Sequence, residues 1–326
     1  MTRNTLIAAG LFLAILFAAF IALAMPGAGM SSAKAFAVLT GNQQGLARTV
    51  VLQWRAPRIL TALLVGAALG IAGSFFQALT RNPLGSPDVI GFSTGAYTGV
   101  IVAMLLGLTE FRFTVLGALL GGIATSLVIV ALSVRTRIDG LRIILVGLGI
   151  SAMLSALNRW LITQGDLEAM MSAATWGAGS LNGIRWPLAG PACLALAIAI
   201  AAALPLRRYL DALALGDLTA TALGLRVNLL KLVLLLAGVL LIAATTAVAG
   251  PIAFIALAAP HIAQRTTLRP KTPLLVSALT GATLLIVADI LAQRAFAPVQ
   301  LPVGLVTVVI GGGYLLYLIS SSTTNR

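Results

Sequence analysis

The chain has 326 residues, of which 60% are hydrophobic and only 9% charged, and its formal net charge at pH 7 is +13. Soluble domains carry about 25% charged residues, so this composition excludes a soluble protein. Nucleic-acid binding is not expected either, because membrane proteins keep Lys and Arg in their loops and no basic face interleaved with aromatic residues is present. A single cysteine, Cys193, and a single histidine, His261, exclude a disulfide framework and a histidine-cluster metal site.

Apolar segments of roughly 20 residues recur along the whole chain, each long enough to cross a ~30 Å hydrocarbon layer as a helix. The spans are expected to be helical, because the hydrocarbon contains no water to satisfy backbone groups. The first apolar run is longer than a signal-peptide core and is interpreted as an uncleaved span. We therefore predict an all-α polytopic membrane protein with about ten transmembrane helices in one domain, residues 1–326. The predicted spans lie near 5–25, 58–79, 92–108, 113–133, 142–162, 188–206, 229–249, 252–267, 274–296 and 303–320.

Ten spans place both termini on the same side of the membrane. Thirteen of the 21 lysines and arginines then fall in segments on the side of the termini, and eight fall on the other side. Cytoplasmic segments carry the excess of positive charge, so both termini are predicted to be cytoplasmic.

Three arginines stand at the outer ends of predicted spans, against this trend. Arg55 and Arg58 lie in the stretch WRAPR just before the second span, and Arg294 ends the ninth. One interpretation is that they are snorkelling anchors at helix ends. The other is that they face outward toward carboxylates on a partner, because a guanidinium fork suits that pairing. Charge alone does not separate the two.

The second and third spans are joined by an unusual turn, residues 81–99, which reads RNPLGSPDVIGFSTGAYTG. Its prolines are expected to end the second helix and stiffen the turn. Asp88 is expected to face the N-terminal end of the third helix, where a negative charge is favoured. Gly91, Gly95 and Gly99 recur every fourth residue and predict a smooth stripe for close helix packing.

The segment 207–228 lies between the sixth and seventh spans, on the predicted cytoplasmic side. Its leucines alternate with small and polar residues in an amphipathic pattern that is too short and broken to span the membrane. Gly216 and Gly224 punctuate the segment and predict two short helices along the membrane surface. Such helices either shield the bundle or form a docking surface for a cytoplasmic protein.

Asp289 is the only carboxylate well inside an apolar span. An ionised Asp in the membrane costs at least a few kcal/mol, so its side chain is expected to face protein and to be paired or hydrogen-bonded. His261 follows Pro260 and is expected to donate to a carbonyl freed by the helix break. A proton relay would need a chain of acidic residues, and the sequence has none.

Several stretches together resemble the permeases that import iron–siderophores, haem and cobalamin, the FecCD/BtuC type. The blocks that carry this resemblance, in chain order, are WRAPRILTALLVGAALGIAGSFFQALTRNPLGSPDVIG, ALGDLTATALGLRV, AGPIAFIALAAPHIAQR and ADILAQR followed by QLPVGLVTVVIGGGYLLYL. They span nearly the whole chain in the family's order. RNPLGSPDVIGFSTGA, WGAGSLNG and VIGGGYLLYL are most similar to ferric-enterobactin permease subunits.

The resemblance implies a type II ABC importer. Such an importer contains two permease subunits of ten helices each, two cytoplasmic ATPase subunits and a periplasmic or lipid-anchored substrate-binding protein. ATP and Mg would be bound by the ATPase subunits, so this chain is expected to hold no cofactor and to have no catalytic residues. The absence of a GxxxxGK[ST] loop from the sequence agrees with a transport subunit that is not itself an enzyme. A heterodimer of permeases is favoured, with a homodimer as the alternative.

The resemblance also implies roles for individual residues. Arg55, Arg58 and Arg294 match the outer arginines that pair with acidic residues on the binding protein. The coupling helix that enters the ATPase cleft is matched by Leu215, Gly216, Asp217, Ala220, Leu223 and Gly224. The inner gate between the fourth and fifth spans is matched by Asp139, Gly140 and Leu141.

Asn158, Arg159 and Trp160 end the fifth span at its predicted outer face. These residues either receive the cargo from the binding protein or form part of the interfacial aromatic belt. The sequence leaves these two interpretations open.

We therefore expect a permease of the bacterial inner membrane that moves a ferric siderophore, of the catecholate, enterobactin-like type, from a binding protein into the cytoplasm. The alternatives are a haem or cobalamin importer permease and an ion-coupled secondary transporter. The lack of a chain of acidic residues argues against ion coupling by protons. A membrane-embedded enzyme would need a reactive cluster of side chains, and the sequence contains none.

Overall fold

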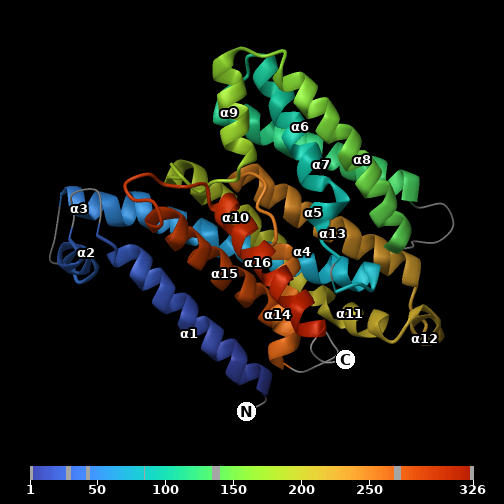
Figure 1. Cartoon of the computed structure of the whole chain (residues 1–326). Coiled ribbons are helices and arrows are strands. Elements are labelled where there is room, and N and C mark those ends of the chain that lie inside the picture. Colours follow the sequence, from blue (N-terminus) through green and yellow to red (C-terminus); the bar gives the residue numbers. More distant parts are fainter. Residues whose placement is uncertain are drawn as a thin grey trace.

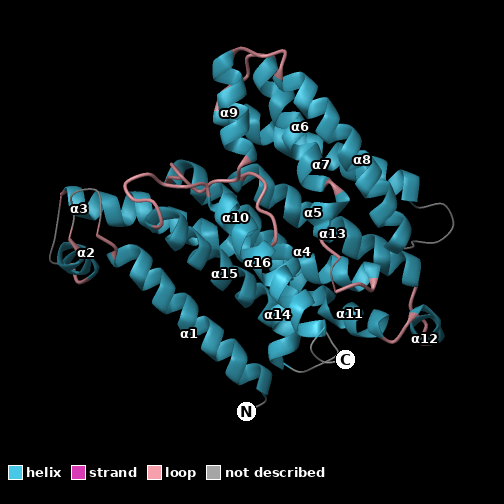
Figure 2. Cartoon of the chain, in the orientation of Figure 1, coloured by secondary structure: helices cyan, strands magenta, loops and turns pink. Residues whose placement is uncertain are grey.

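Helices account for all the regular structure in the computed structural model, which describes residues 3–26, 31–41, 45–83, 85–133, 140–267 and 273–323 (Figure 1 and Figure 2). The elements in chain order are α1 (Arg3–Ala24), α2 (Ser32–Leu39), α3 (Leu46–Thr49), the π-helical segment η1 (Val50–Arg55), α4 (Ala56–Thr80), α5 (Pro87–Ile90), α6 (Phe92–Leu105), α7 (Phe111–Ser133), α8 (Gly140–Ile162), α9 (Leu167–Gly177), α10 (Trp186–Ala203), the 3₁₀ turn η2 (Leu204–Leu206), α11 (Arg207–Ala214), α12 (Asp217–Ala222), α13 (Val227–Ala249), α14 (Ile255–Thr267), α15 (Leu274–Arg294) and α16 (Val303–Thr323). The predicted all-α class is confirmed.

Seven helices in the described part of the chain are long and apolar enough to cross a membrane. They are α1, Leu46–Thr80 with α4, α7, α8, Trp186–Ala214 with α10, α13 and α15. The other three predicted spans correspond to α6, α14 and α16. α6 has only 14 residues, α14 has 13 with a proline inside it, and the apolar part of α16 runs over Val303–Leu316. The count of about ten spans therefore stays a prediction.

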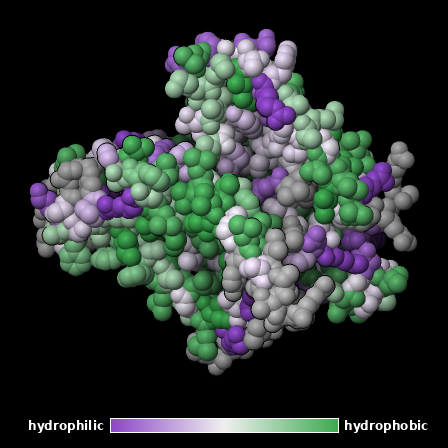
Figure 3. Space-filling model, in the orientation of Figure 1, coloured by the Kyte–Doolittle hydropathy of each residue, from purple (hydrophilic) through white to green (hydrophobic). Residues whose placement is uncertain are grey.

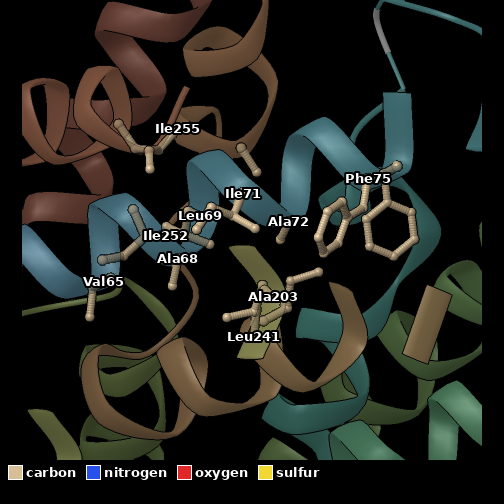
Figure 4. Packing of buried hydrophobic residues seen from close by; sticks show 14 of the residues in the cluster. Val65, Ala68, Leu69, Ile71, Ala72, Phe75, Ala203, Leu241, Ile252 and Ile255 are labelled. Carbon is tan, nitrogen blue, oxygen red and sulfur yellow. The ribbon is translucent and has the colours of Figure 1, made fainter. Parts of the chain in front are cut away.

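α4 is the central helix of the molecule. Its neighbours are α10, α13, α14 and α15, and apolar side chains cover it on all sides. Figure 4 shows Val65, Leu69 and Phe75 of α4 among Leu241 and Ile255 from the surrounding elements. A helix that is hydrophobic all round is buried, which explains why α4 has no polar face.

Glycines on α4 allow its neighbours to approach backbone to backbone. A Cβ added at Gly66 would collide with the carbonyl oxygen of Gly281 on α15, and one at Gly73 would collide with the carbonyl oxygen of Ala256 on α14. Such small residues let membrane helices pack closely. The glycines of α4 are therefore positions of close helix packing.

The predicted glycine stripe is confirmed for two of its three members. A Cβ at Gly95 or Gly99 on α6 would meet the backbone of α7 at Gly121 and Gly117. Gly91 instead lies against α8, and with φ of +89° it forms the turn between α5 and α6. A stripe read from spacing alone misses this change of neighbour, because the helix does not begin until after Gly91.

The turn after α4 differs in detail from its prediction. Ser86 caps α5 by accepting a hydrogen bond from the backbone N–H of Asp88. The Asp88 carboxylate accepts from the backbone N–H of Phe254, just before α14, with an N–O distance of 3.3 Å. It is also hydrogen-bonded to the side chain of Ser93 in the first turn of α6, so it faces the start of the third predicted span as expected without capping its backbone. Burial raises the pKa of the Asp88 carboxyl to about 6, and the charged form that accepts this bond therefore predominates at neutral pH.

Apolar side chains also cover much of the outside of the molecule (Figure 3). They are most numerous on helices such as α1, α7 and α8, whose large hydrophobic residues point away from the bundle. An exposed apolar surface of this extent is typical of a protein embedded in lipid or covered by partner subunits.

Candidate functional site

The N-terminal end of α4 borders a cavity of about 550 Å³. It lies among the end of α1, the segment η1, the loop before α10 and the end of α15. Four arginines line it: Arg55, Arg58, Arg185 and Arg294. Of the described residues that line the cavity, none is an aspartate or a glutamate, so its wall is strongly basic.

Two of these arginines are held by the C-terminal end of α1. Arg55 donates from Nη1 to the carbonyl oxygens of Leu23 and Met25, at 2.7 and 2.6 Å. Arg294 donates from Nη2 to the carbonyl oxygen of Pro26 at 2.8 Å. Leu23 is in the last turn of α1, where carbonyls have no intrahelical donor and carry a partial negative charge, so its oxygen suits a guanidinium group. Met25 and Pro26 follow the helix directly. The contacts fix both arginines at the mouth of the cavity.

Arg58 has a different environment. Its guanidinium is buried and forms a bidentate pair with Asp289, with Nη2–Oδ1 and Nε–Oδ2 distances of 2.8 and 3.0 Å. Gln300 accepts from Arg58 Nη1, and Gln293 donates to the Asp289 carboxylate. The prediction that Asp289 is paired within the protein is confirmed. The prediction that Arg58 faces outward like the other two arginines is corrected, because its guanidinium neutralises the buried carboxylate of Asp289.

Arg185 is part of the cavity wall although no pattern in the sequence singles it out. Its guanidinium carbon lies 4.6 Å from the centre of the Trp54 ring, on the cavity wall. The next residue, Trp186, donates from Nε1 to the carbonyl oxygen of Leu52 at 2.6 Å, which ties this loop to η1. Residues 54 and 185 are far apart in sequence, and only the folded chain brings them together.

At the opposite end of the molecule, the predicted coupling segment forms α11 and α12 (Figure 1). The two short helices predicted from the glycine punctuation are confirmed, with Gly216 between them at φ +99° and Gly224 after them at φ +80°. Leu215, Leu218 and Leu223 are 58, 87 and 63% exposed, so the segment presents leucines away from the bundle.

Asp217, the first residue of α12, connects this segment to two long helices. Its Oδ1 lies 2.7 Å from Nη2 of Arg81, directly after α4, and its Oδ2 lies 2.7 Å from Nζ of Lys231 on α13. Ala220 on the inner side of α12 is buried. The coupling segment is therefore joined to the C-terminal end of α4 by charge as well as by packing.

Of the predicted inner gate, Asp139 lies outside the described residues. Gly140 begins α8 and packs against the end of α4, where a Cβ would lie 2.6 Å from Cα of Thr80 and 2.7 Å from the carbonyl oxygen of Leu79. Leu141 is exposed. Gly140 and the predicted coupling segment thus meet the same end of α4.

The residues proposed to receive cargo do not share one surface. Asn158 is buried, and its Nδ2 donates to the carbonyl oxygen of Thr94 on α6 at 3.4 Å. Arg159 and Trp160 are exposed on the other side of α8.

His261 is bound to a side chain. Its Nδ1 lies 2.7 Å from the hydroxyl oxygen of Tyr314 on α16, which corrects the expectation that it donates to a freed backbone carbonyl. The bond joins α14 to α16 and is consistent with a structural role for the histidine.

The long apolar helices and the apolar outer surface define a multi-pass helical membrane protein, with charged clusters at the two ends of its central helix. The profile of the FecCD transport family matches residues 13–321. The chain belongs to this family.

Individual relatives agree with this placement. The chain is 47% identical, over 91% of its length and 90% of the relative's, to the ferric enterobactin transport system permease protein FepG of Escherichia coli strain K12. It is 36% identical to the iron(3+)-hydroxamate import system permease protein FhuG of Bacillus subtilis strain 168, over 94% of each chain. A solved structure of a metal-chelate type ABC transporter in an inward-facing conformation superposes with a TM-score of 0.85 at 26% identity, covering 97% of this chain and 99% of that one.

Proposed function

We propose that this chain is the transmembrane permease subunit of an ABC importer that carries a ferric siderophore of the catecholate, enterobactin-like type into the cytoplasm. The observation that carries the proposal is the 47% identity to a ferric enterobactin permease across nine tenths of the chain. The family and the metal-chelate type structural relative support the same class. The bacterial relatives and the apolar helices indicate a multi-pass inner-membrane protein.

The assembly is proposed as follows. Residues 1–326 form one permease domain that includes the coupling segment 207–228 and has both termini in the cytoplasm. Arg3 donates to the carbonyl oxygen of Thr266, so the first residues of α1 lie beside the end of α14. The chain pairs with a second permease, with a heterodimer favoured over a homodimer. Two cytoplasmic ATPases bind ATP and Mg and perform the hydrolysis, so this chain needs no cofactor of its own.

Docking of the binding protein is assigned to the mouth of the basic cavity. Arg55 and Arg294 are oriented by backbone carbonyls and border the mouth, where their guanidinium groups suit carboxylates on the two lobes of that protein. Arg58 supports this surface from inside the protein, because its pair with Asp289 holds α4 against α15 beneath the cavity.

Energy transfer is assigned to α12. Leu218 on α12 and the flanking Leu215 and Leu223 are exposed and suit an apolar groove on an ATPase, and Asp217 connects the segment to α4 and α13. ATP binding would then favour one arrangement of the spans over another, as coupling requires. The pathway is proposed to run between the two permeases along α8 and α16, which expose apolar side chains such as Leu148 and Val309.

Uptake into proteoliposomes tests this function. With the partner subunits and the binding protein present, we expect radiolabelled ferric enterobactin to accumulate only when ATP is enclosed with the ATPases, and a proton ionophore to leave the rate unchanged. Haemin in the same assay is the control for cargo, because a hemin permease of Yersinia pestis is 38% identical to this chain. Uptake that persists without ATP and collapses with the ionophore would identify a secondary transporter.

Replacing Asp217 by asparagine is expected to lower the amount of chelate imported per ATP hydrolysed by about tenfold. The Arg81–Asp217 pair is exposed and contributes under about 1 kcal/mol to stability, and asparagine keeps a hydrogen-bonding oxygen for the buried Lys231 amine. The chain should therefore still fold, while α12 loses its register on α4 and α13. The measurement is the ratio of uptake to phosphate release in proteoliposomes. Asp211→Asn on α11 makes the same charge change as a control. An unchanged ratio in the Asp217 variant would show that its ion pairs do not transmit the motion.

A further inference from the structure

We propose that Arg185, stacked on Trp54, completes the basic cavity as a docking pocket that takes a carboxylate side chain of the substrate-binding protein. This inference rests on the proposed function and adds a residue to its docking surface. The docking surface is then a pocket of about 550 Å³ with arginines on several walls, and not a set of separate arginines at its mouth.

The first argument is charge. Four arginines from three parts of the chain line one cavity, and the described lining residues include no carboxylate. The carboxylate of Asp289 neutralises Arg58, which is the deepest of the four. For Arg185 and Arg294, no carboxylate of the described part of the chain lies within ion-pairing distance. Like charges gathered in this way repel one another, and an acidic group entering from outside would relieve that repulsion.

The second argument is the way in which Arg185 is held. The guanidinium carbon of Arg185 lies over the Trp54 ring, which holds the group by a cation–π contact. The N–H groups of a guanidinium held in this way can still bind a carboxylate in bidentate fashion. The loop that carries it is fixed by the bond from Trp186 to the carbonyl of Leu52. The side chain is thus oriented before any partner arrives, which lowers the entropy lost on binding.

The third argument concerns the kind of partner. Arg185 and Arg294 are exposed, while Arg58 is buried beneath them, so the cavity opens outward from the bundle. It lies at the end of α4 opposite the coupling segment, where the proposed function places the binding protein (Figure 1). A basic pocket on this side is complementary to an acidic protein surface, and we commit to that partner. A lipid phosphate has similar chemistry and is an outcome of the test.

The test compares Arg185→Gln with Arg112→Gln. Arg112 also stacks on an aromatic ring, that of Phe113 at 4.8 Å, but it belongs to α7 and does not line the cavity. The assembled permease–ATPase complex in nanodiscs is titrated with the binding protein that restores uptake in the proteoliposome assay. We expect Arg185→Gln to raise the Kd about tenfold and to flatten its dependence on salt, and Arg112→Gln to leave both unchanged. Trp54→Leu, which keeps the charge but removes the stacking platform, should weaken binding in the same direction.

The outcomes separate this inference from the proposed function. If a double variant, Arg55→Glu with Arg294→Glu, abolishes docking while Arg185→Gln and Trp54→Leu bind as well as the wild type, the pocket is overturned and the docking surface stands. If none of these variants affects docking, the pocket and the docking surface at Arg55 and Arg294 are both overturned. If Arg185→Gln instead loses co-purifying anionic phospholipid, measured by mass spectrometry, and its Kd is unchanged, the pocket is a lipid site and the inference is overturned.

Discussion

Replacing Gly73 by alanine is expected to lower the apparent Tm of the purified chain by roughly 5–10 °C. A Cβ at this position of α4 would collide with the carbonyl oxygen of Ala256, and the obstacle is backbone, which cannot rotate away. The carbonyl lies there because Pro260 has no N–H to donate four residues back, so Ala256 lacks its intrahelical partner. Its oxygen instead faces the Cα of Gly73, where a weak Cα–H···O contact is available.

Gly190→Ala on α10 is the matched control. Nothing lies within 4 Å of a Cβ added there, and alanine favours a helix over glycine by about 1 kcal/mol. The control should therefore be neutral or slightly stabilising. Gly73→Ala has the same propensity gain, but overpacking of up to about 3 kcal/mol outweighs it. Thermal unfolding in detergent, followed by size-exclusion profile, measures both. Equal Tm values for the two variants would mean that α4 and α14 move apart to accept the added methyl group without loss of stability.

The sequence predicts the helical class and the positions of the long elements well, because length and hydropathy are local properties. It predicts packing less completely. The spacing of Gly95 and Gly99 shows that α6 has a smooth face, but it does not show that α7 covers this face or that Gly91 belongs to a turn against α8. The identity of a neighbour depends on how helices from distant parts of the chain are arranged, and no pattern within one helix encodes it.

The same limit explains the candidate site. A carboxylate in an apolar span must have a partner, and this argument correctly predicts a paired Asp289. It does not say which cation is recruited, and Arg58 was grouped with Arg55 and Arg294 because all three stand at the ends of spans. Arg185 carried no signal at all, because its stacking partner Trp54 is joined to it only by the fold. The coupling segment was easier to predict, since its glycines and leucines are contiguous.

The buried pair of Arg58 and Asp289 is expected to show the largest loss of stability on single substitution. Asp289→Leu leaves a guanidinium without its carboxylate in a buried site, and Arg58→Met leaves the converse, so each should cost about 3–5 kcal/mol. The double variant removes both charges together and should recover most of that loss, because replacing a buried ion pair by apolar groups is often neutral or stabilising. Thermal or denaturant unfolding of the four proteins gives the coupling energy as a double-mutant cycle.

This cycle also decides how Arg58 acts in transport. If its role is to hold α4 against α15 beneath the basic cavity, the double variant, once stable, should dock the binding protein and import chelate at rates near those of the wild type. If Arg58 itself meets a carboxylate of that protein, the double variant would be stable yet would bind weakly, as the Arg55 and Arg294 variants are expected to do. If the stability losses of the two single variants simply add in the double variant, the result would contradict an ion pair between Arg58 and Asp289. Stability and docking measured on the same double variant therefore distinguish a guanidinium that supports the docking surface from one that belongs to it.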